Sequence, residues 1–107
     1  MSKPHVLSMK QYLAAAGIAT VRVGGSGDCG ADLLAETPSG TAVIQRKFYS
    51  YSVGYDAAKE AYAAKALYKA TAAFVVTNAA YTRQARRTAQ QLGVTLANHA
   101  EIAAVLK

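Results

Sequence analysis

An unbroken apolar run, Ala72 to Thr77 (AAFVVT), constrains the fold of this chain most strongly. A strand with one face in water alternates apolar and polar residues, whereas a strand without that alternation is typical of a sheet covered by helices on both faces. Helical patterns precede and follow the run in the sequence. We therefore predict an α/β protein with helices on both sides of a mixed sheet.

Glycine and proline residues divide the rest of the chain into elements. Gly17 ends a first amphipathic helix, and the turn Pro38-Ser39-Gly40 joins two strands into an antiparallel hairpin. The order αβββαβαβα predicts this hairpin followed by β-α-β crossovers, in three layers α/β/α within a single domain over residues 1–107. The expected helices are 5–16, 53 or 54 to 69, 81–92 and 99–106, and the expected strands are 18–23, 31–37, 41–48, 72–77 and 94–97.

The charge balance indicates a polyanionic partner. The chain has 12 Lys and Arg against 6 Asp and Glu, a net charge of +6, which makes nucleic acid the first candidate. No apolar run approaches the roughly 20 residues of a transmembrane helix, and the first residues lack the apolar stretch of a secretory signal. We therefore expect a soluble, cytoplasmic protein with no membrane partner.

Polar side chains interrupt the predicted hairpin at Asp32 and again at Gln45, Arg46 and Lys47. Residues two apart in a strand share a face, so Gln45 and Lys47 point one way and Arg46 points the other. The turn decides what lies opposite Asp32. If residue 37 pairs with residue 40, the partner is Gln45; if it pairs with residue 41, the partner is Arg46. The pattern leaves both registers open.

These groups have the chemistry that phosphodiester cleavage needs. The carboxylate of Asp32, the amide oxygen of Gln45 and the backbone carbonyl of Arg46 are hard oxygen ligands of the kind that Mg²⁺ prefers. Lys47 would orient or deprotonate the attacking water and stabilise the charge that builds on the phosphorane. A purely structural interpretation also exists, in which Asp32 caps a turn, Gln45 is an ordinary strand residue and Lys47 extends along an exposed face.

Three motifs occur in order: GDCGAD at 27–32, QRK at 45–47 and VVTN at 75–78. With them the chain resembles the catalytic domain of the Mrr family of restriction endonucleases, in the PD-(D/E)xK nuclease superfamily, over about residues 17–106. The resemblance implies a restriction-endonuclease-like fold, which agrees with the element order. It also implies a metal-dependent nuclease with Asp32 as metal-binding aspartate, Gln45 in a position usually held by Asp or Glu, and Lys47 as catalytic lysine.

The first predicted helix departs from the superfamily pattern because it has no acidic residue, whereas many members carry a metal-binding acid there. Asp28, in the glycine-rich loop, and Glu60, on the long helix, are candidates to replace it. Asp28 beside glycine is also typical of a turn residue. Glu60 has the alternative role of an exposed helix residue paired with a lysine such as Lys65.

Basic and aromatic residues near the hairpin predict contacts with DNA. Tyrosines mixed with cations are typical of surfaces that hold a nucleic-acid backbone and its bases, although tyrosines near a strand end also serve in packing. Arg83 and Arg87 are four residues apart on an expected helix and so share a face. The candidate DNA-binding residues are Arg46, Tyr49, Tyr51, Lys59, Arg83 and Arg87.

Together these features predict a Mg²⁺-dependent DNA endonuclease, with Mn²⁺ able to substitute, that acts in restriction of foreign DNA or in DNA repair. A Holliday-junction-resolvase-like nuclease is the first alternative, because such enzymes share the fold, the small size and the basic surface. A non-catalytic nucleic-acid-binding module is the second, indicated by Gln45 and by the first helix without an acid. Sequence selectivity would require a homodimer or a separate DNA-recognition subunit or domain.

Overall fold

Five strands form a mixed sheet whose spatial order, β1-β2-β3-β4-β5, follows the chain. The computed structural model describes residues 9–23, 33–48 and 52–106. Within these segments no helix is long and apolar enough to cross a bilayer. The elements are α1 (Met9–Ala15), β1 (Thr20–Arg22), β2 (Leu33–Thr37), β3 (Gly40–Arg46), α2 (Tyr55–Leu67), β4 (Ala72–Thr77), α3 (Arg83–Leu92), β5 (Thr95–Asn98), η1 (His99–Glu101) and α4 (Ile102–Leu106).

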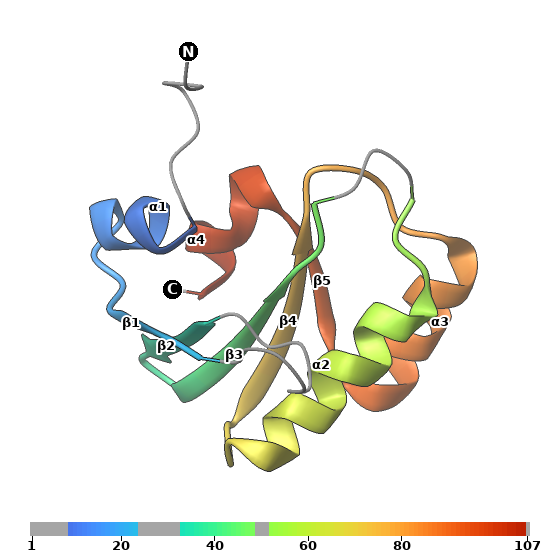
Figure 1. Cartoon of the computed structure of the whole chain (residues 1–107), viewed down its shortest axis with the longest axis horizontal. Helices are drawn as coiled ribbons and strands as arrows, with labels where there is room; N and C mark the ends of the chain where they lie inside the picture. Colours follow the sequence, from blue (N-terminus) through green and yellow to red (C-terminus); the bar gives the residue numbers. More distant parts are fainter. Residues whose placement is uncertain (1–8, 24–32, 49–51, 107) are drawn as a thin grey trace.

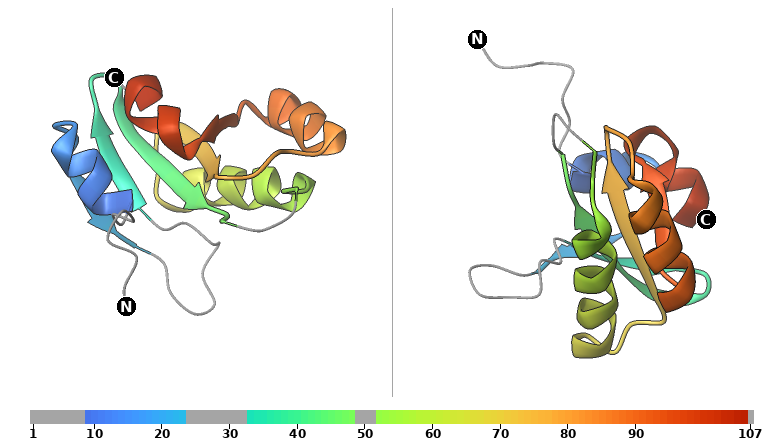
Figure 2. Two further views of the ribbon diagram at one scale, coloured as in Figure 1. Left: turned by 90° about the horizontal axis from the view of Figure 1, so that it is seen from above. Right: turned by 90° about the vertical axis from the view of Figure 1, so that its right-hand side faces the viewer.

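The predicted element order and layers are confirmed. Strands β1, β2 and β3 are antiparallel neighbours, whereas β3, β4 and β5 are parallel and connected through α2 and α3. Helices α1 and α4 cover one face of the sheet, and α2 and α3 cover the other (Figures 1 and 2). Strand β4 is buried from Ala73 to Thr77, as expected for a strand between two helical layers.

Alternate residues of β3 pack into two separate cores. Ile44 packs with Leu13 of α1 and Ile102 of α4, whereas Val43 packs with the alanines that α2 turns toward the sheet. Those α2 residues are Ala57, Ala58, Ala61 and Ala64. Because alanine projects only a methyl group, the helix lies close to the strands, and polar side chains of β3 are within reach of α2.

The hairpin adopts the tighter of the two possible registers. Thr37 pairs with Gly40, and the pairing continues to Leu33 opposite Ile44. Gly40 has a φ of +128°, and a Cβ there would lie 2.7 Å from the hydroxyl oxygen of Thr71, so glycine fits this turn for two reasons. Asp32, the next residue toward the N-terminus, lies outside the described residues.

Several predicted boundaries were wrong at the ends of elements. Strand β3 begins at Gly40 and ends at Arg46, not at Phe48, although the backbone amide of Lys47 still donates to Val76 of β4 at 2.8 Å. Helix α3 begins at Arg83, because the Thr82 side chain accepts from the amide of Ala85 and caps the helix. The last predicted helix begins as the 3-10 turn η1, capped by Asn98.

Tyr81, predicted inside a helix, instead connects the two parallel strands to the loop before α2. Its hydroxyl lies 2.9 Å from the carbonyl oxygen of Val75 and 2.7 Å from that of Ala97. Its backbone forms a bridge with Val53. Burial raises the pKa of the Tyr81 phenol to about 12, because the charged form would lose its solvation.

We expect Tyr81→Phe to lower the free energy of unfolding by about 1–2 kcal/mol, since a part-buried hydrogen bond to strand carbonyls is lost. The pKa of Tyr81 is higher in the folded protein than in the unfolded chain. The contribution of its hydroxyl to the free energy of unfolding is therefore complete below pH 10 and is lost as the pH rises through about 12. Urea unfolding at pH 7 checks this, with Tyr62→Phe on the exposed face of α2 as the control. Equal stability of wild type and Tyr81→Phe would contradict the assignment.

Candidate active site

The predicted catalytic residues Gln45 and Lys47 lie at the carboxyl end of β3, on the side of the sheet that faces α2. The side chain of Gln45 is fully buried, and that of Lys47 is 21% exposed. Both contact α2, whereas Ile44 packs toward α1 and α4. The prediction that Gln45 and Lys47 share a strand face is confirmed.

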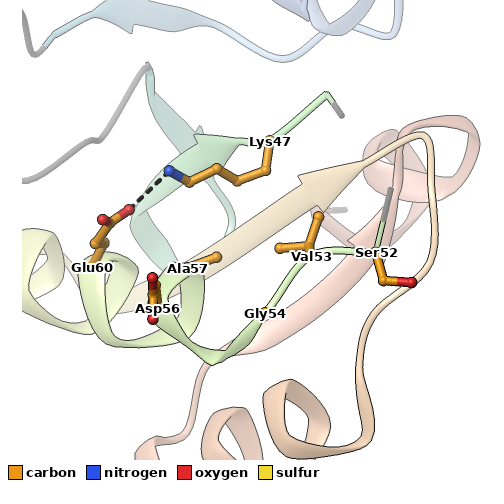
Figure 3. A pocket seen from close by; sticks show the side chains of 7 residues that line it. All are labelled: Lys47, Ser52, Val53, Gly54, Asp56, Ala57 and Glu60. Carbon is orange, nitrogen blue, oxygen red and sulfur yellow. Dashed lines mark ion pairs between the residues drawn. The ribbon is translucent and has the colours of Figure 1, made fainter. Parts of the chain in front are cut away.

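Glu60 of α2 meets both residues through one carboxylate oxygen. Its Oε1 accepts a hydrogen bond from Gln45 Nε2 and lies 2.9 Å from Lys47 Nζ. Figure 3 shows Lys47 extending from the end of β3 toward Glu60 across the gap between strand and helix. Among the described residues, Glu60 therefore forms its ion pair with Lys47. The alternative prediction for Glu60 had named a lysine such as Lys65 as its partner.

A pocket of about 260 Å³ opens beside this ion pair, at the N-terminus of α2 (Figure 3). Two hydrogen bonds fix the segment that forms its wall: Val53 N donates to Ala80 O at 2.8 Å, and Thr82 N donates to Val53 O at 3.0 Å. The pocket is lined by Lys47, Ser52, Val53, Gly54, Asp56, Ala57 and Glu60.

The pocket combines groups that attract anions with groups that attract cations. Gly54 caps α2 without a side-chain hydrogen bond, so the amides of the first turn add partial positive charge to that of Lys47. Asp56 and Glu60 add two carboxylates on the same helix. An anion bridged to a cation would satisfy both sets of groups.

Gln45 adds an oxygen whose hydrogen-bonding capacity is not used. Among the residues that the structure describes, Gln45 Oε1 is a buried atom without a hydrogen-bond partner. A buried acceptor without a partner is costly, and an amide oxygen is a hard ligand suited to Mg²⁺. The Glu60 carboxylate lies on the nitrogen side of the same amide, so once the amide turns over, its oxygen and that carboxylate form a donor set that fits a hard divalent cation. Within the described segments, no three His, Cys, Asp or Glu side chains lie close enough together to hold a metal ion. The predicted ligands Asp28 and Asp32 lie outside these segments.

The family model for restriction endonucleases with an Mrr catalytic domain matches residues 7–106. The chain belongs to this family. It is therefore a restriction-endonuclease-like nuclease domain, and its fold is the one that the motifs implied. The Mrr catalytic domain accounts for nearly the whole chain, including β3, α2 and the pocket between them.

A comparison of structures finds the same fold in the crystal structure of AF1548, a protein of unknown function. The TM-score is 0.68 at 24% sequence identity, over 82% of this chain. This chain spans about half of that protein, 53% of its length. No curated protein has a significant sequence match to this chain.

Arg46, which supplies a backbone carbonyl in the predicted metal site of this Mrr-family chain, turns its side chain away from α2. Its guanidinium carbon lies 5.4 Å from the ring centroid of Phe48. The Phe48 ring in turn contacts His99 of η1 at 5.2 Å. The prediction that Arg46 and Lys47 point to opposite faces is confirmed.

Three of the other predicted DNA-binding residues, Lys59, Arg83 and Arg87, lie on the helical layer that carries Glu60. Lys59 is exposed on α2, with its Nζ 5.3 Å from the ring centroid of Tyr55. Arg83 and Arg87 are exposed one turn apart on α3. Tyr49 and Tyr51 lie outside the described residues.

Asp56 and Ser52 also line the pocket of this Mrr domain, and neither was predicted from the sequence. A signal for Asp56 was present: it precedes Glu60 by four residues, which puts both carboxylates on one flank of α2. Ser52 had no such signal, because its place depends on the hydrogen bonds that hold Val53 against the loop before α3.

Proposed function

We propose that this Mrr-family domain is a Mg²⁺-dependent DNA endonuclease, with Mn²⁺ able to replace Mg²⁺, that acts in restriction of foreign DNA. The observation that carries the proposal is the pocket at the N-terminus of α2. Lys47 and the first turn of α2 attract a phosphate, while Asp56 and Glu60 attract a cation. A scissile phosphate with a divalent metal ion matches this combination of charges.

The metal would be held by the oxygens of Asp32, Gln45 and the Arg46 carbonyl, with Glu60 or Asp28 as a further carboxylate. When bound, a divalent ion supplies a Lewis acid and lowers the pKa of a coordinated water. The observed Thr37–Gly40 register supports Asp32 in this role, because this is the register for which the sequence predicts Asp32 opposite Gln45.

Lys47 would act on the substrate directly. Its ammonium group is held by Glu60 at the edge of the pocket, and its side chain is 21% exposed. In that position it would orient or deprotonate the attacking water and stabilise charge on the phosphorane. The 2.9 Å ion pair would be rearranged when the metal and the phosphate enter.

DNA would be bound by Arg46, Tyr49, Tyr51, Lys59, Arg83 and Arg87. The net charge of +6 supports this, since basic proteins concentrate DNA through its phosphates. Cutting both strands needs two active sites, which a homodimer would supply, whereas a separate recognition subunit or domain would supply sequence selectivity. A single copy of this domain would otherwise nick one strand at a time.

A plasmid assay tests the proposal. We expect supercoiled DNA to be nicked with Mg²⁺ or Mn²⁺, to stay intact with EDTA, and to be cut at least about 100-fold more slowly by Asp32→Ala. DNA binding, measured in EDTA, should persist in that variant and weaken steeply with salt. No cutting with either metal, while salt-sensitive binding persists, would contradict the nuclease and indicate a DNA-binding domain.

A further inference from the structure

Phe48 directly follows Lys47 and presents an aromatic ring at the end of β3. The side chain is 40% exposed, although it has no polar group to interact with water. Two neighbours fix its position. The Arg46 guanidinium carbon lies 5.4 Å from its ring centroid, and the His99 ring meets it nearly at right angles, with the centroids 5.2 Å apart.

The contacts continue into the opposite helical layer. His99 stacks on Tyr12 of α1 with ring centroids 4.9 Å apart, and the Tyr12 hydroxyl donates to Ala100 O at 3.0 Å. We call Arg46, Phe48, His99 and Tyr12 the aromatic row. Because α1, β3 and η1 each contribute to this row, the Phe48 ring is held in place before any ligand arrives.

The charge of the aromatic row comes from Arg46. Burial, and then the nearby Arg46 guanidinium, lower the pKa of His99. A neutral imidazole therefore lies beside the ring at neutral pH, while arginine stays charged. A permanent cation next to an exposed aromatic ring is the combination that single-stranded nucleic-acid sites use to hold a phosphate and stack a base.

The row and the catalytic pocket flank the same strand end from opposite sides. Consecutive Cα atoms are about 3.8 Å apart, yet Lys47 reaches Glu60 of α2 while Phe48 contacts His99 of η1. A DNA strand with its phosphate at Lys47 would cross the end of β3 and bring the neighbouring base to Phe48.

We propose that the aromatic row binds an unpaired DNA base next to the scissile phosphate, with the base stacked on Phe48 and the backbone near Arg46. Bases inside a duplex are covered on both faces by their neighbours, so the ring can receive only a base that has left the stack. The inference rests on the proposed nuclease function and adds that one base beside the scissile phosphate leaves the duplex stack. DNA in which that base is already unpaired, as in a gap or a flap, therefore binds more tightly.

A binding experiment in EDTA tests this without relying on cleavage. The probe is a short duplex with one unpaired 2-aminopurine, compared by anisotropy and 2-aminopurine fluorescence with the same duplex fully paired. We expect wild type to bind the unpaired probe at least about fivefold more tightly, because stacking of one base on an aromatic ring contributes affinity on this scale. The same stacking should quench the 2-aminopurine fluorescence. Phe48→Ala should lose both effects, and Phe48→Trp should keep them.

Matched variants separate stacking from folding. Tyr62→Ala removes an aromatic ring of similar exposure, 48%, from α2 and should leave the preference intact. Phe48→Leu keeps an apolar side chain without a ring and replaces Phe48→Ala if that variant unfolds. His99→Ala should reduce quenching, because the ring loses its support.

Equal affinity of wild type for both probes, or a preference that survives in Phe48→Ala and Phe48→Leu, would overturn the inference. Absence of any DNA binding would overturn it together with the DNA part of the proposed function. If the preference depends on the Phe48 ring but no metal supports cutting, the aromatic row stands and only the nuclease proposal fails.

Discussion

Lys47→Ala should reduce the rate of DNA cleavage by about 10²–10³-fold while changing DNA affinity by less than about threefold. A fixed cation that stabilises charge in the transition state accelerates the reaction on this scale. DNA binding should change little, because Lys47 is one phosphate contact among several, and its loss lowers the salt dependence of binding by at most about one ion. The Lys47 ammonium is positioned for the first role, because its side chain is only 21% exposed and lies 2.9 Å from Glu60.

The matched control is Lys65→Ala, which removes a lysine from α2 at a distance from the pocket that Lys47 lines. It should cut DNA at the wild-type rate. Single-turnover cleavage with saturating DNA separates the chemical step from binding. A loss of affinity in Lys47→Ala with an unchanged single-turnover rate would make Lys47 a DNA contact and remove it from catalysis.

Glu60→Gln should have the second large effect, a loss of at least about 100-fold in cleavage together with a fall of about 10–100-fold in metal affinity. Replacing a ligand or its supporting partner reduces metal affinity or activity on this scale. The substitution keeps the size of the side chain but removes the charge that Gln45 and Lys47 share. Glu36→Gln, exposed on β2, provides a charge-matched control.

Binding of Mn²⁺, followed by electron paramagnetic resonance, distinguishes two roles for Glu60. A metal ligand lost in Glu60→Gln raises the concentration of Mn²⁺ needed for half saturation. A residue that only positions Lys47 leaves Mn²⁺ binding unchanged while cleavage falls. The second result would remove Glu60 from the proposed metal site and leave it as the partner of Lys47.

The layers of this fold were predictable because local signals agreed with one another. The apolar run Ala72 to Thr77 indicated a strand covered on both faces, and glycine and proline marked the breaks between elements. The hairpin register was not predictable, since a turn that closes on Gly40 and one that closes on Thr41 use the same residues. The close approach of Thr71 to Gly40, which involves a residue 31 positions away in the sequence, favours the tighter turn.

The site was predictable along β3 but not across to α2. Alternation in a strand is enough to put Gln45 and Lys47 on one face. The rotation of α2 about its own axis was not predictable, because alanines occur on its exposed side, at Ala63 and Ala66, as well as on its buried side. With similar residues around the helix, the sequence does not show which flank faces the sheet, and only the packed structure directs Glu60 toward Lys47.

The agreement between spatial order and chain order in the sheet has a consequence for how the protein forms. Each strand pairs with the strand before it in the sequence, so the longest excursion between paired strands is the one through α2, from Arg46 to Ala72. Short excursions cost little chain entropy and favour rapid folding. The described groups of the ion pair belong to a hairpin and the helix that follows it, so they can come together while the last strand is still being synthesised.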